Sequence, residues 1–383
     1  MDSLEKFATS KLAELEAQHL RRWLAQTDRT DNAIAVRNGR RLISFCCNDY
    51  LNLSQHPQVK QAAIDATQRL GAGAGASRLV SGNHSLYREL ETALARLKGT
   101  QDACVFGSGY LANLGIIPAL VGPGDLILAD ALSHACLMAG GKLSNAETII
   151  FRHNDMAHIA ELLGARRHQY RHCLILTDGV FSMDGDLAPV QELADTARKF
   201  DAWLMTDDAH GVGVLADGRG SSFVHGEKSD VPLQMGTLSK AVGVYGGYVC
   251  ASTAIIDLIR TRARTLIYST GLPPGVVASA IAALEIISRE PELCAAPVQK
   301  ARRFTRAMNL PDAQSPIVPL IVGDAARALA LSAMLEQAGF LVTAIRPPTV
   351  PQGTARLRFT FTAAHVDADI DRLAGLLQTA ELK

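Results

Sequence analysis

Short apolar runs alternate with helical stretches between Leu86 and Ala251, and this alternation constrains the fold more than any other feature. Apolar side chains recur with helical spacing in stretches such as Leu86–Leu97 and Val190–Lys199. Seven candidate strands lie around them, at residues 103–106, 126–129, 148–151, 173–177, 203–206, 233–235 and 248–251. Strands joined through helices usually run parallel, because the chain crosses over the sheet between them. The sequence therefore predicts an α/β fold with a large, mostly parallel seven-stranded sheet covered by helices on both faces.

The segments on either side of this alternation predict smaller units. Residues 3–26 have helical spacing, and residues 33–45 are typical of a hairpin on an Asn-Gly turn. An alanine-rich helix is expected at 276–288, followed by strands at 317–322, 340–345 and 356–362 and by helices at 325–338 and from Val366. We therefore predict an N-terminal helix and hairpin segment (1–50), a large α/β domain (51–289) and a small C-terminal α+β domain (290–383).

Charge and cysteine content exclude several classes of protein. Lys and Arg number 38, as do Asp and Glu, and the resulting net charge of zero argues against nucleic-acid binding. Seven cysteines form no C-x-x-C pair, and the charged first residues do not resemble a secretory leader, which favours reduced thiols in the cytoplasm. The uncharged stretch 103–124 contains five glycines and two prolines, so we expect no membrane-spanning helix there.

A glycine turn follows the first predicted strand, at the edge where ligands bind in open α/β sheets. Backbone N–H groups and the helix dipole at Gly107-Ser108-Gly109 could hold a phosphate. The same turn could be a dinucleotide fingerprint, with Asp130 at the spacing of the ribose-binding acid, or simply a tight connection. The turn by itself leaves these three interpretations open.

Two further segments carry reactive side chains after strand ends. Asp207 and His210 lie three residues apart and could converge on one ligand, although a capped loop with a solvated histidine is the simpler interpretation. Lys240 has apolar neighbours, which would lower its pKa and suit it to Schiff-base chemistry, whereas surface lysines are more common in general. Together, a phosphate-binding turn, an aspartate for a pyridine nitrogen and a lysine for an aldehyde are the parts of a pyridoxal phosphate site.

The order of these segments resembles the fold-type I pyridoxal-phosphate enzymes, and further motifs resemble the α-oxoamine synthases among them. Those motifs are residues 44–51, 77–82, 130–135, 179–186 and 356–358. They cover nearly the whole chain in order. Residues 266–270 and 344–351 look most like members of this family that condense L-alanine with a pimeloyl thioester in biotin biosynthesis.

The resemblance implies a role for each of several residues. Lys240, His134 and Asp207 would be catalytic, with Lys240 holding the cofactor aldehyde and His134 serving in proton transfer. Pyridoxal 5'-phosphate would be bound by Gly109, Tyr110, His134, Ser182, Asp207, His210, Thr237 and Lys240. Arg346 would clamp the amino-acid carboxylate, Arg21 and Thr349 would contact the acyl substrate, and Asn48 and His134 would also bind substrate. Asp178 stands where this family usually has Glu.

The family likeness implies a homodimeric acyltransferase with its active site at the subunit interface. The acyl donor would be carried by coenzyme A or by acyl carrier protein, and no nucleic acid, membrane or metal would be involved. His168 and His172 are four residues apart among Arg166, Arg167 and Arg171, and this setting favours a solvated basic face over a metal site. The alternatives are another α-oxoamine synthase such as glycine C-acetyltransferase, a nicotinamide-dependent dehydrogenase, and a non-catalytic regulator that senses pyridoxal phosphate.

Overall fold

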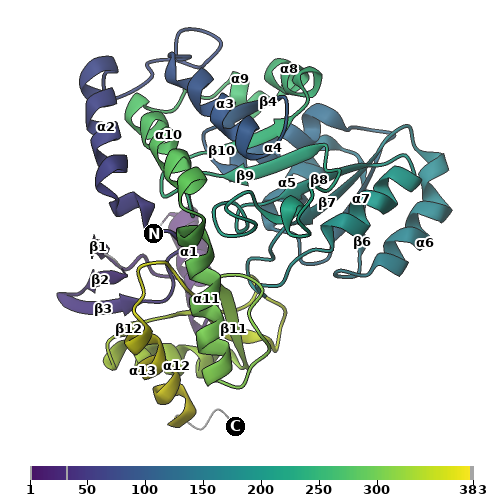
Figure 1. Ribbon diagram of the computed structural model, residues 1–383. Coiled ribbons are helices and arrows are strands. Elements are labelled where there is room, and N and C mark those ends of the chain that lie inside the picture. Colours follow the sequence, from purple (N-terminus) through teal and green to yellow (C-terminus); the bar gives the residue numbers. More distant parts are fainter. Residues whose placement is uncertain (1, 32, 380–383) are drawn as a thin grey trace.

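The computed structural model describes residues 2–31 and 33–379. A seven-stranded sheet forms the centre of its upper part in Figure 1. Its order is β4-β10-β9-β8-β7-β5-β6. The strands are β4 (Asp102–Phe106), β5 (Leu126–Asp130), β6 (Glu147–Phe151), β7 (Cys173–Asp178), β8 (Trp203–Asp207), β9 (Leu233–Thr237) and β10 (Gly247–Ala251). Each predicted strand is therefore present, with its bounds shifted by at most two residues.

The sheet is mostly parallel, as predicted. Strands β6, β5, β7, β8 and β9 pair in parallel, whereas β10 is antiparallel to both β9 and β4. The reversal has a simple cause: a loop without a helix joins β9 to β10, and such a short connection returns the chain as a hairpin. This loop carries Lys240.

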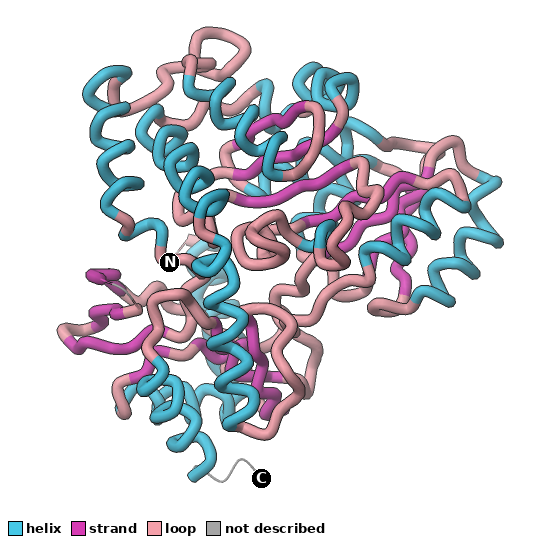
Figure 2. Tube along the Cα trace, viewed as in Figure 1, coloured by secondary structure: helices cyan, strands magenta, loops and turns pink. Residues whose placement is uncertain are grey.

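Helices cover both faces of the large sheet. Figure 2 shows them as cyan segments on either side of the magenta strands. Successive strand residues point to opposite faces. Accordingly, Cys104 packs in a cluster with Ile116 of α4, while Val105 packs in another with Leu90 of α3 and Val277 of α10. The helices of this part are α2 (Pro57–Leu70), α3 (Leu86–Leu97), α4 (Gly109–Leu120), α5 (Ala135–Ser144), α6 (Met156–Arg166), α7 (Val190–Lys199), α8 (Thr253–Arg262), α9 (Arg264–Ile267) and α10 (Pro274–Arg289).

A smaller part lies below this sheet in Figure 1. It contains α11 (Pro291–Ala307), β11 (Ile317–Gly323), α12 (Ala325–Gln337), β12 (Phe340–Leu341), β13 (Thr343–Ile345), β14 (Ala355–Thr360) and α13 (Asp367–Thr379). The single strand expected at 340–345 is wrong, because β12 and β13 join different sheets. The junction of α10 and α11 supports our proposed boundary near residue 290, where α10 packs on α2 and α3 and α11 packs on α13.

The N-terminal segment differs most from expectation. Helix α1 (Ser3–Ala17) ends nine residues before the predicted end at residue 26, and His19 follows it with a positive φ of 56°. A strand that was not predicted, β1 (Thr27–Asp31), pairs with β2 (Ile34–Arg37), which pairs in turn with β3 (Arg40–Ser44). Strand β3 also pairs with β12, so the hairpin shares a sheet with the C-terminal unit. Among the described residues, no helix has the length and apolar character that crossing a membrane requires.

Candidate active site

The carboxyl ends of three adjacent strands bring the predicted residues together. Asp178 at the end of β7 pairs in register with Asp207 at the end of β8, and Asp207 pairs with Met235 of β9. A cavity of about 250 Å³ opens at these ends. Seven of the predicted site residues line it: Gly109, Tyr110, His134, Asp207, His210, Thr237 and Lys240.

Lys240 is held as a half-buried amine. Its Nζ lies 2.7 Å from Nε2 of His210. Burial lowers the pKa of Lys240 to about 8, with a further lowering by the charge of Arg358 and an opposing effect from Asp207. The predicted lowering of the lysine pKa is confirmed, and a substantial fraction of Lys240 is uncharged at mildly alkaline pH.

His210 is also buried, so the interpretation as a solvated loop histidine is wrong. Its Nδ1 lies 2.6 Å from the hydroxyl of Tyr50, on the side of the ring opposite Lys240. Burial and the positive charges of Lys240 and Arg358 hold the pKa of His210 well below its usual value. The imidazole is therefore neutral at physiological pH and fixed between two partners.

Asp207 is anchored within the cavity wall by an amide side chain and a backbone N–H. Asn113 Nδ2 donates to its Oδ2 at 2.7 Å, and the backbone N–H of Ala209 donates to its Oδ1 at 3.0 Å. Burial and the charge of Asp207 raise the pKa of Asp178 well above its usual value. Asp208 instead forms a fully buried ion pair with Lys98, at 2.7 Å.

His134 caps helix α5 at the cavity. Its ring Nδ1 accepts the backbone N–H of Cys136 at 3.2 Å, and its own backbone N–H donates to Oδ1 of Asp178 at 3.1 Å. Burial lowers the pKa of His134, with Asp207 opposing and Lys240 adding to the effect. Asp178 thus contacts the His134 backbone directly, despite being one methylene shorter than the Glu expected from the family.

The glycine turn begins helix α4 at the cavity. Oγ of Ser108 accepts the backbone N–H of Leu111 at 3.2 Å as a helix cap. A Cβ on Gly109 would lie 3.3 Å from Cβ of Thr237, so a larger residue would crowd the close approach of this turn to β9. The free N–H groups of a helix start form an anion site. Asp130 is bound instead to His153 at 2.9 Å and does not line the cavity, so the dinucleotide interpretation lacks its ribose-binding acid.

Five predicted residues do not line this cavity. Ser182 is buried, and its backbone carbonyl accepts a hydrogen bond from Arg358, as does Oδ1 of Asn48 at 3.2 Å. Arg346 instead donates to the carbonyl of His19. Arg346 and Thr349 line a second cavity of about 280 Å³ with Arg22 and Trp23, and Arg21 lies over the Trp23 ring at 3.9 Å.

Several residues of the site had no predicted role. Asn113, Cys136 and Tyr50 contact Asp207, His134 and His210 directly. Asn113 could have been noticed, because an amide side chain in the middle of an otherwise apolar helix needs a partner when it is buried. For Cys136 and Tyr50, no feature of the neighbouring sequence indicates a role in the site. Arg358 belongs to the family motif at residues 356–358, but the sequence alone did not indicate a role for it.

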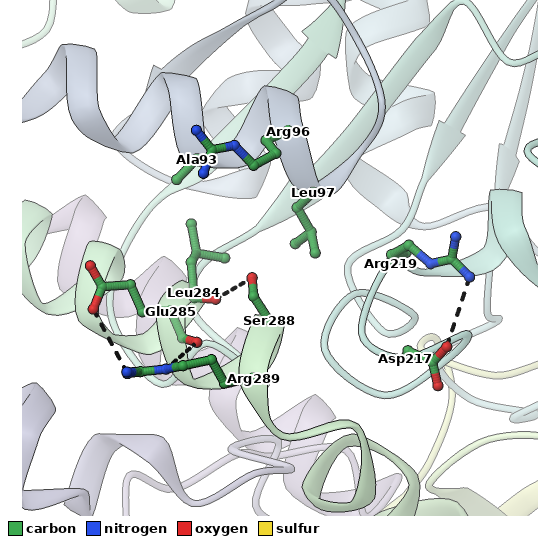
Figure 3. Close-up of a pocket in the computed structure, with 9 residues that line it drawn as sticks. All are labelled: Ala93, Arg96, Leu97, Asp217, Arg219, Leu284, Glu285, Ser288 and Arg289. Atoms are coloured by element: carbon green, nitrogen blue, oxygen red, sulfur yellow. Dashed lines mark hydrogen bonds and ion pairs between the residues drawn. The ribbon is translucent and has the colours of Figure 1, made fainter.

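A larger cavity, of about 740 Å³, lies apart from these residues between α3 and α10 (Figure 3). Arg219 pairs with Asp217 at 3.8 Å on one side of it, and Arg289 pairs with Glu285 at 3.9 Å on another. None of the predicted site residues lines it. The chemistry of the chain is concentrated in the smaller cavity at the strand ends.

The smaller cavity fits pyridoxal 5'-phosphate. The amine of Lys240 can bond to an aldehyde, the carboxylate of Asp207 can hold a proton on a pyridine nitrogen, and the α4 N-terminus can bind a phosphate. Close packing of Gly109 on Thr237 keeps the turn beside the end of β9. Binding of a nicotinamide cofactor would give no role to Lys240 or Asp207.

Comparison with known proteins agrees with this geometry. The family model for class I and II aminotransferases matches residues 40–377. The chain belongs to the class I and II aminotransferase family. Among its relatives, an 8-amino-7-oxononanoate synthase from Methylocella silvestris is 66% identical over 88% of this chain and 97% of that protein. Another, from Granulibacter bethesdensis, is 58% identical over 99% of this chain and 98% of that protein.

Solved structures superpose on most or nearly all of the chain. Serine palmitoyltransferase from Sphingomonas wittichii superposes with a TM-score of 0.93 at 33% identity, over 99% of this chain and 98% of the other. An 8-amino-7-oxononanoate synthase from Francisella tularensis superposes with a TM-score of 0.75 at 28% identity, over 89% and 98%. The predicted fold-type I transferase architecture is confirmed.

Proposed function

We propose that the protein is a pyridoxal-phosphate-dependent acyltransferase that condenses L-alanine with a pimeloyl thioester to give 8-amino-7-oxononanoate. The reaction joins the α-carbon of alanine to the thioester carbonyl, breaks the C–S bond and releases carbon dioxide and free thiol. The observation that carries the proposal is the Lys240 amine, with its lowered pKa, in one cavity with Asp207 and the α4 N-terminus. The names and high identity of the Methylocella and Granulibacter relatives support the substrates.

The protein side chains bind and orient the cofactor. When bound, pyridoxal phosphate supplies an electron sink for the electrons left on the amino-acid α-carbon. Asp207 keeps a proton on the pyridine nitrogen, and its two hydrogen-bond donors, Asn113 and the Ala209 N–H, fix the carboxylate for this task. Gly109, Tyr110 and Thr237 form the phosphate end of the site.

Lys240 accepts a proton in this reaction, and His134 polarises a substrate oxygen. With its pKa lowered to about 8, Lys240 is uncharged often enough at neutral pH to accept the α-proton on Nζ. His134 is neutral and lines the same cavity, where it donates a hydrogen bond to a substrate oxygen. His210 holds the Lys240 amine in place at 2.7 Å.

We assign the amino-acid carboxylate to Arg358 rather than to Arg346. Its charge acts on both Lys240 and His210, and it is buried beside Ser182 and Asn48. Arg346 lies with Thr349 in the second cavity, which suits it to the acyl substrate together with Arg21. A buried guanidinium matches a carboxylate with two parallel hydrogen bonds.

Arg358→Ala should raise the KM for alanine by roughly 10–150-fold, the effect of losing a charged hydrogen-bonding partner. Arg346→Ala should leave the alanine KM unchanged and raise that for the thioester. Steady-state kinetics with each substrate varied in turn checks both, with unfolding temperatures to confirm intact folds. Partial rescue by Arg358→Lys is expected, because lysine keeps the charge and loses the fork. If the KM for alanine rose in Arg346→Ala and not in Arg358→Ala, the carboxylate-binding residue would be Arg346.

A homodimer is part of the proposal. Ser77 pairs with Thr270 in an isolated bridge, so two loops lie together, and they expose Leu79, Val80 and Tyr268. Such an apolar surface supports contact with a second copy, which light scattering in solution would test. The seven cysteines are all free thiols, which supports a cytoplasmic location.

Purified protein tests the proposed function in a simple comparison. With pyridoxal phosphate present, L-alanine and pimeloyl-CoA should release free thiol. Glycine with acetyl-CoA should release far less. Faster release from glycine and acetyl-CoA would instead indicate a glycine C-acetyltransferase.

A further inference from the structure

Cys136 links His134 to Asp207 at the wall of the active-site cavity. Its Sγ lies 2.8 Å from Nδ1 of His134, while Asn113 Nδ2 lies 3.0 Å from the same sulfur. Asn113 also donates to Oδ2 of Asp207, which lies 3.9 Å from Sγ. An amide nitrogen can only donate, so the sulfur accepts from Asn113. The thiol proton is then directed to His134, the nearer of the two remaining acceptors.

The Nδ1 atom of His134 therefore receives two hydrogen-bond donors. One is the backbone N–H of Cys136, at 3.2 Å, and the other is the Cys136 thiol. The thiol keeps its proton, because burial and the charge of Asp207 raise the pKa of Cys136 to about 12. A ring nitrogen that accepts hydrogen bonds cannot carry a proton itself, so the neutral imidazole carries its proton on Nε2.

We propose that Cys136 is a positioning residue that fixes the tautomer of His134, with Nδ1 as acceptor and Nε2–H as the donor left for a ligand. This inference rests on the proposed function and deepens it, since the hydrogen bond from His134 to a substrate oxygen requires this tautomer. Cys136 acts through His134 and contacts no reacting atom. The backbone bond from His134 to Asp178 holds the cap residue in place.

Other charged and titratable groups also face His134. They are Asp207 from β8, Asp178 from β7, Lys240 from the β9–β10 loop and His210 after β8. A substitution at Cys136 removes none of these charged groups, although Oδ2 of Asp207 loses its 3.9 Å contact with Sγ. A change in the His134 titration upon that substitution therefore reports the thiol contribution.

The tautomer can be measured directly. Ring ¹⁵N spectra of the histidine-labelled, full-length holoenzyme at neutral pH should show His134 with a proton on Nε2 and none on Nδ1, assigned by the signals lost in His134→Gln. A proton on Nδ1 would overturn the proposal. Because this readout needs no turnover, it stands or falls separately from the proposed reaction.

Two substitutions test the part played by the thiol. Cys136→Ala removes a donor to the neutral ring, so the NMR-measured pKa of His134 should rise by about half to one pH unit. The acid limb of the pH–rate profile should move upward with it, because a neutral His134 is required. Cys136→Ser keeps a donor and should restore both values, while Cys173→Ala, at a buried thiol on β7, should change neither.

Two results would contradict the role of the thiol. One is an unchanged His134 pKa in a folded Cys136→Ala protein. The other is a Cys136→Ser protein in which the His134 pKa rises as far as in Cys136→Ala. If Cys136→Ala does not fold, the tautomer of His134 in the wild-type protein and the His134 pKa in Cys136→Ser still test the proposal.

Discussion

Lys240→Ala should abolish turnover and leave the fold intact. No other lysine in the part of the chain that the structure describes lines the cavity at the strand ends, and an amine there is needed to bond to the cofactor aldehyde and leave it again in each cycle. The side chain is half-buried, and its polar contact is one hydrogen bond to His210, so little else depends on it. Assays with saturating alanine, pimeloyl-CoA and pyridoxal phosphate should show no thiol release above background.

Lys228→Ala is a matched control for this loss. Lys228 also has a pKa lowered by burial, but it donates to the carbonyl of Gly99 and lies outside the cavity. Its alanine variant should keep normal turnover. Borohydride reduction of the wild-type holoenzyme followed by peptide mapping should place the cofactor on Lys240, and a cofactor-bearing peptide with another lysine would contradict the assignment.

Asp207→Asn should keep the fold and lose most activity. A neutral amide cannot hold a proton on a pyridine nitrogen, and the ring then becomes a poorer electron sink. Losing ~3–5 kcal/mol of transition-state stabilisation slows a reaction by roughly 10²–10⁴-fold. The measurement is kcat at saturating cofactor, together with the absorbance spectrum to confirm that cofactor is bound.

A comparison with Asn113→Ala separates the effect of the Asp207 charge from the effect of the position of its carboxylate. Asn113 donates to Oδ2 of Asp207, so its loss leaves the charge but loosens the carboxylate, and kcat should fall less than in Asp207→Asn. Asp208 cannot replace Asp207, because it is committed to Lys98 and to the backbone N–H of Ser221. Wild-type kcat in a cofactor-loaded Asp207→Asn protein would remove the aspartate from the mechanism.

Much of the fold could be predicted because its signals are local. The strands are short apolar runs with clear ends, and α3 and α7 have strong one-sided apolar patterns, so their bounds were predicted correctly. Strand β1 was missed because Thr27–Asp31 has no apolar residue. Helix α1 was predicted too long, because residues 18–26 keep apolar spacing although His19 takes a positive φ of 56°, which a right-handed helix does not continue through.

The residues of the site also fall into two groups: those that local sequence predicts and those whose contacts depend on the folded chain. Lys240, Asp207 and His210 follow strand ends, where position along the chain already indicates position in space. The choice between Arg346 and Arg358 depends on how β13 and β14 pair and which face each arginine takes, and no local pattern contains that information. The contacts of Cys136 and Asn113 join α4, α5 and β8, so they become visible in the folded chain alone.

One labelling experiment tests the proposed reaction most directly. Wild-type protein with pyridoxal phosphate is given L-alanine ¹³C-labelled in the carboxyl group, with pimeloyl-CoA or pimeloyl-acyl carrier protein as donor, and products are analysed by mass spectrometry. We predict unlabelled 8-amino-7-oxononanoate and an equal amount of labelled carbon dioxide with at least one donor. Absence of this product with both donors, from protein that carries the cofactor on Lys240, would contradict the proposed function.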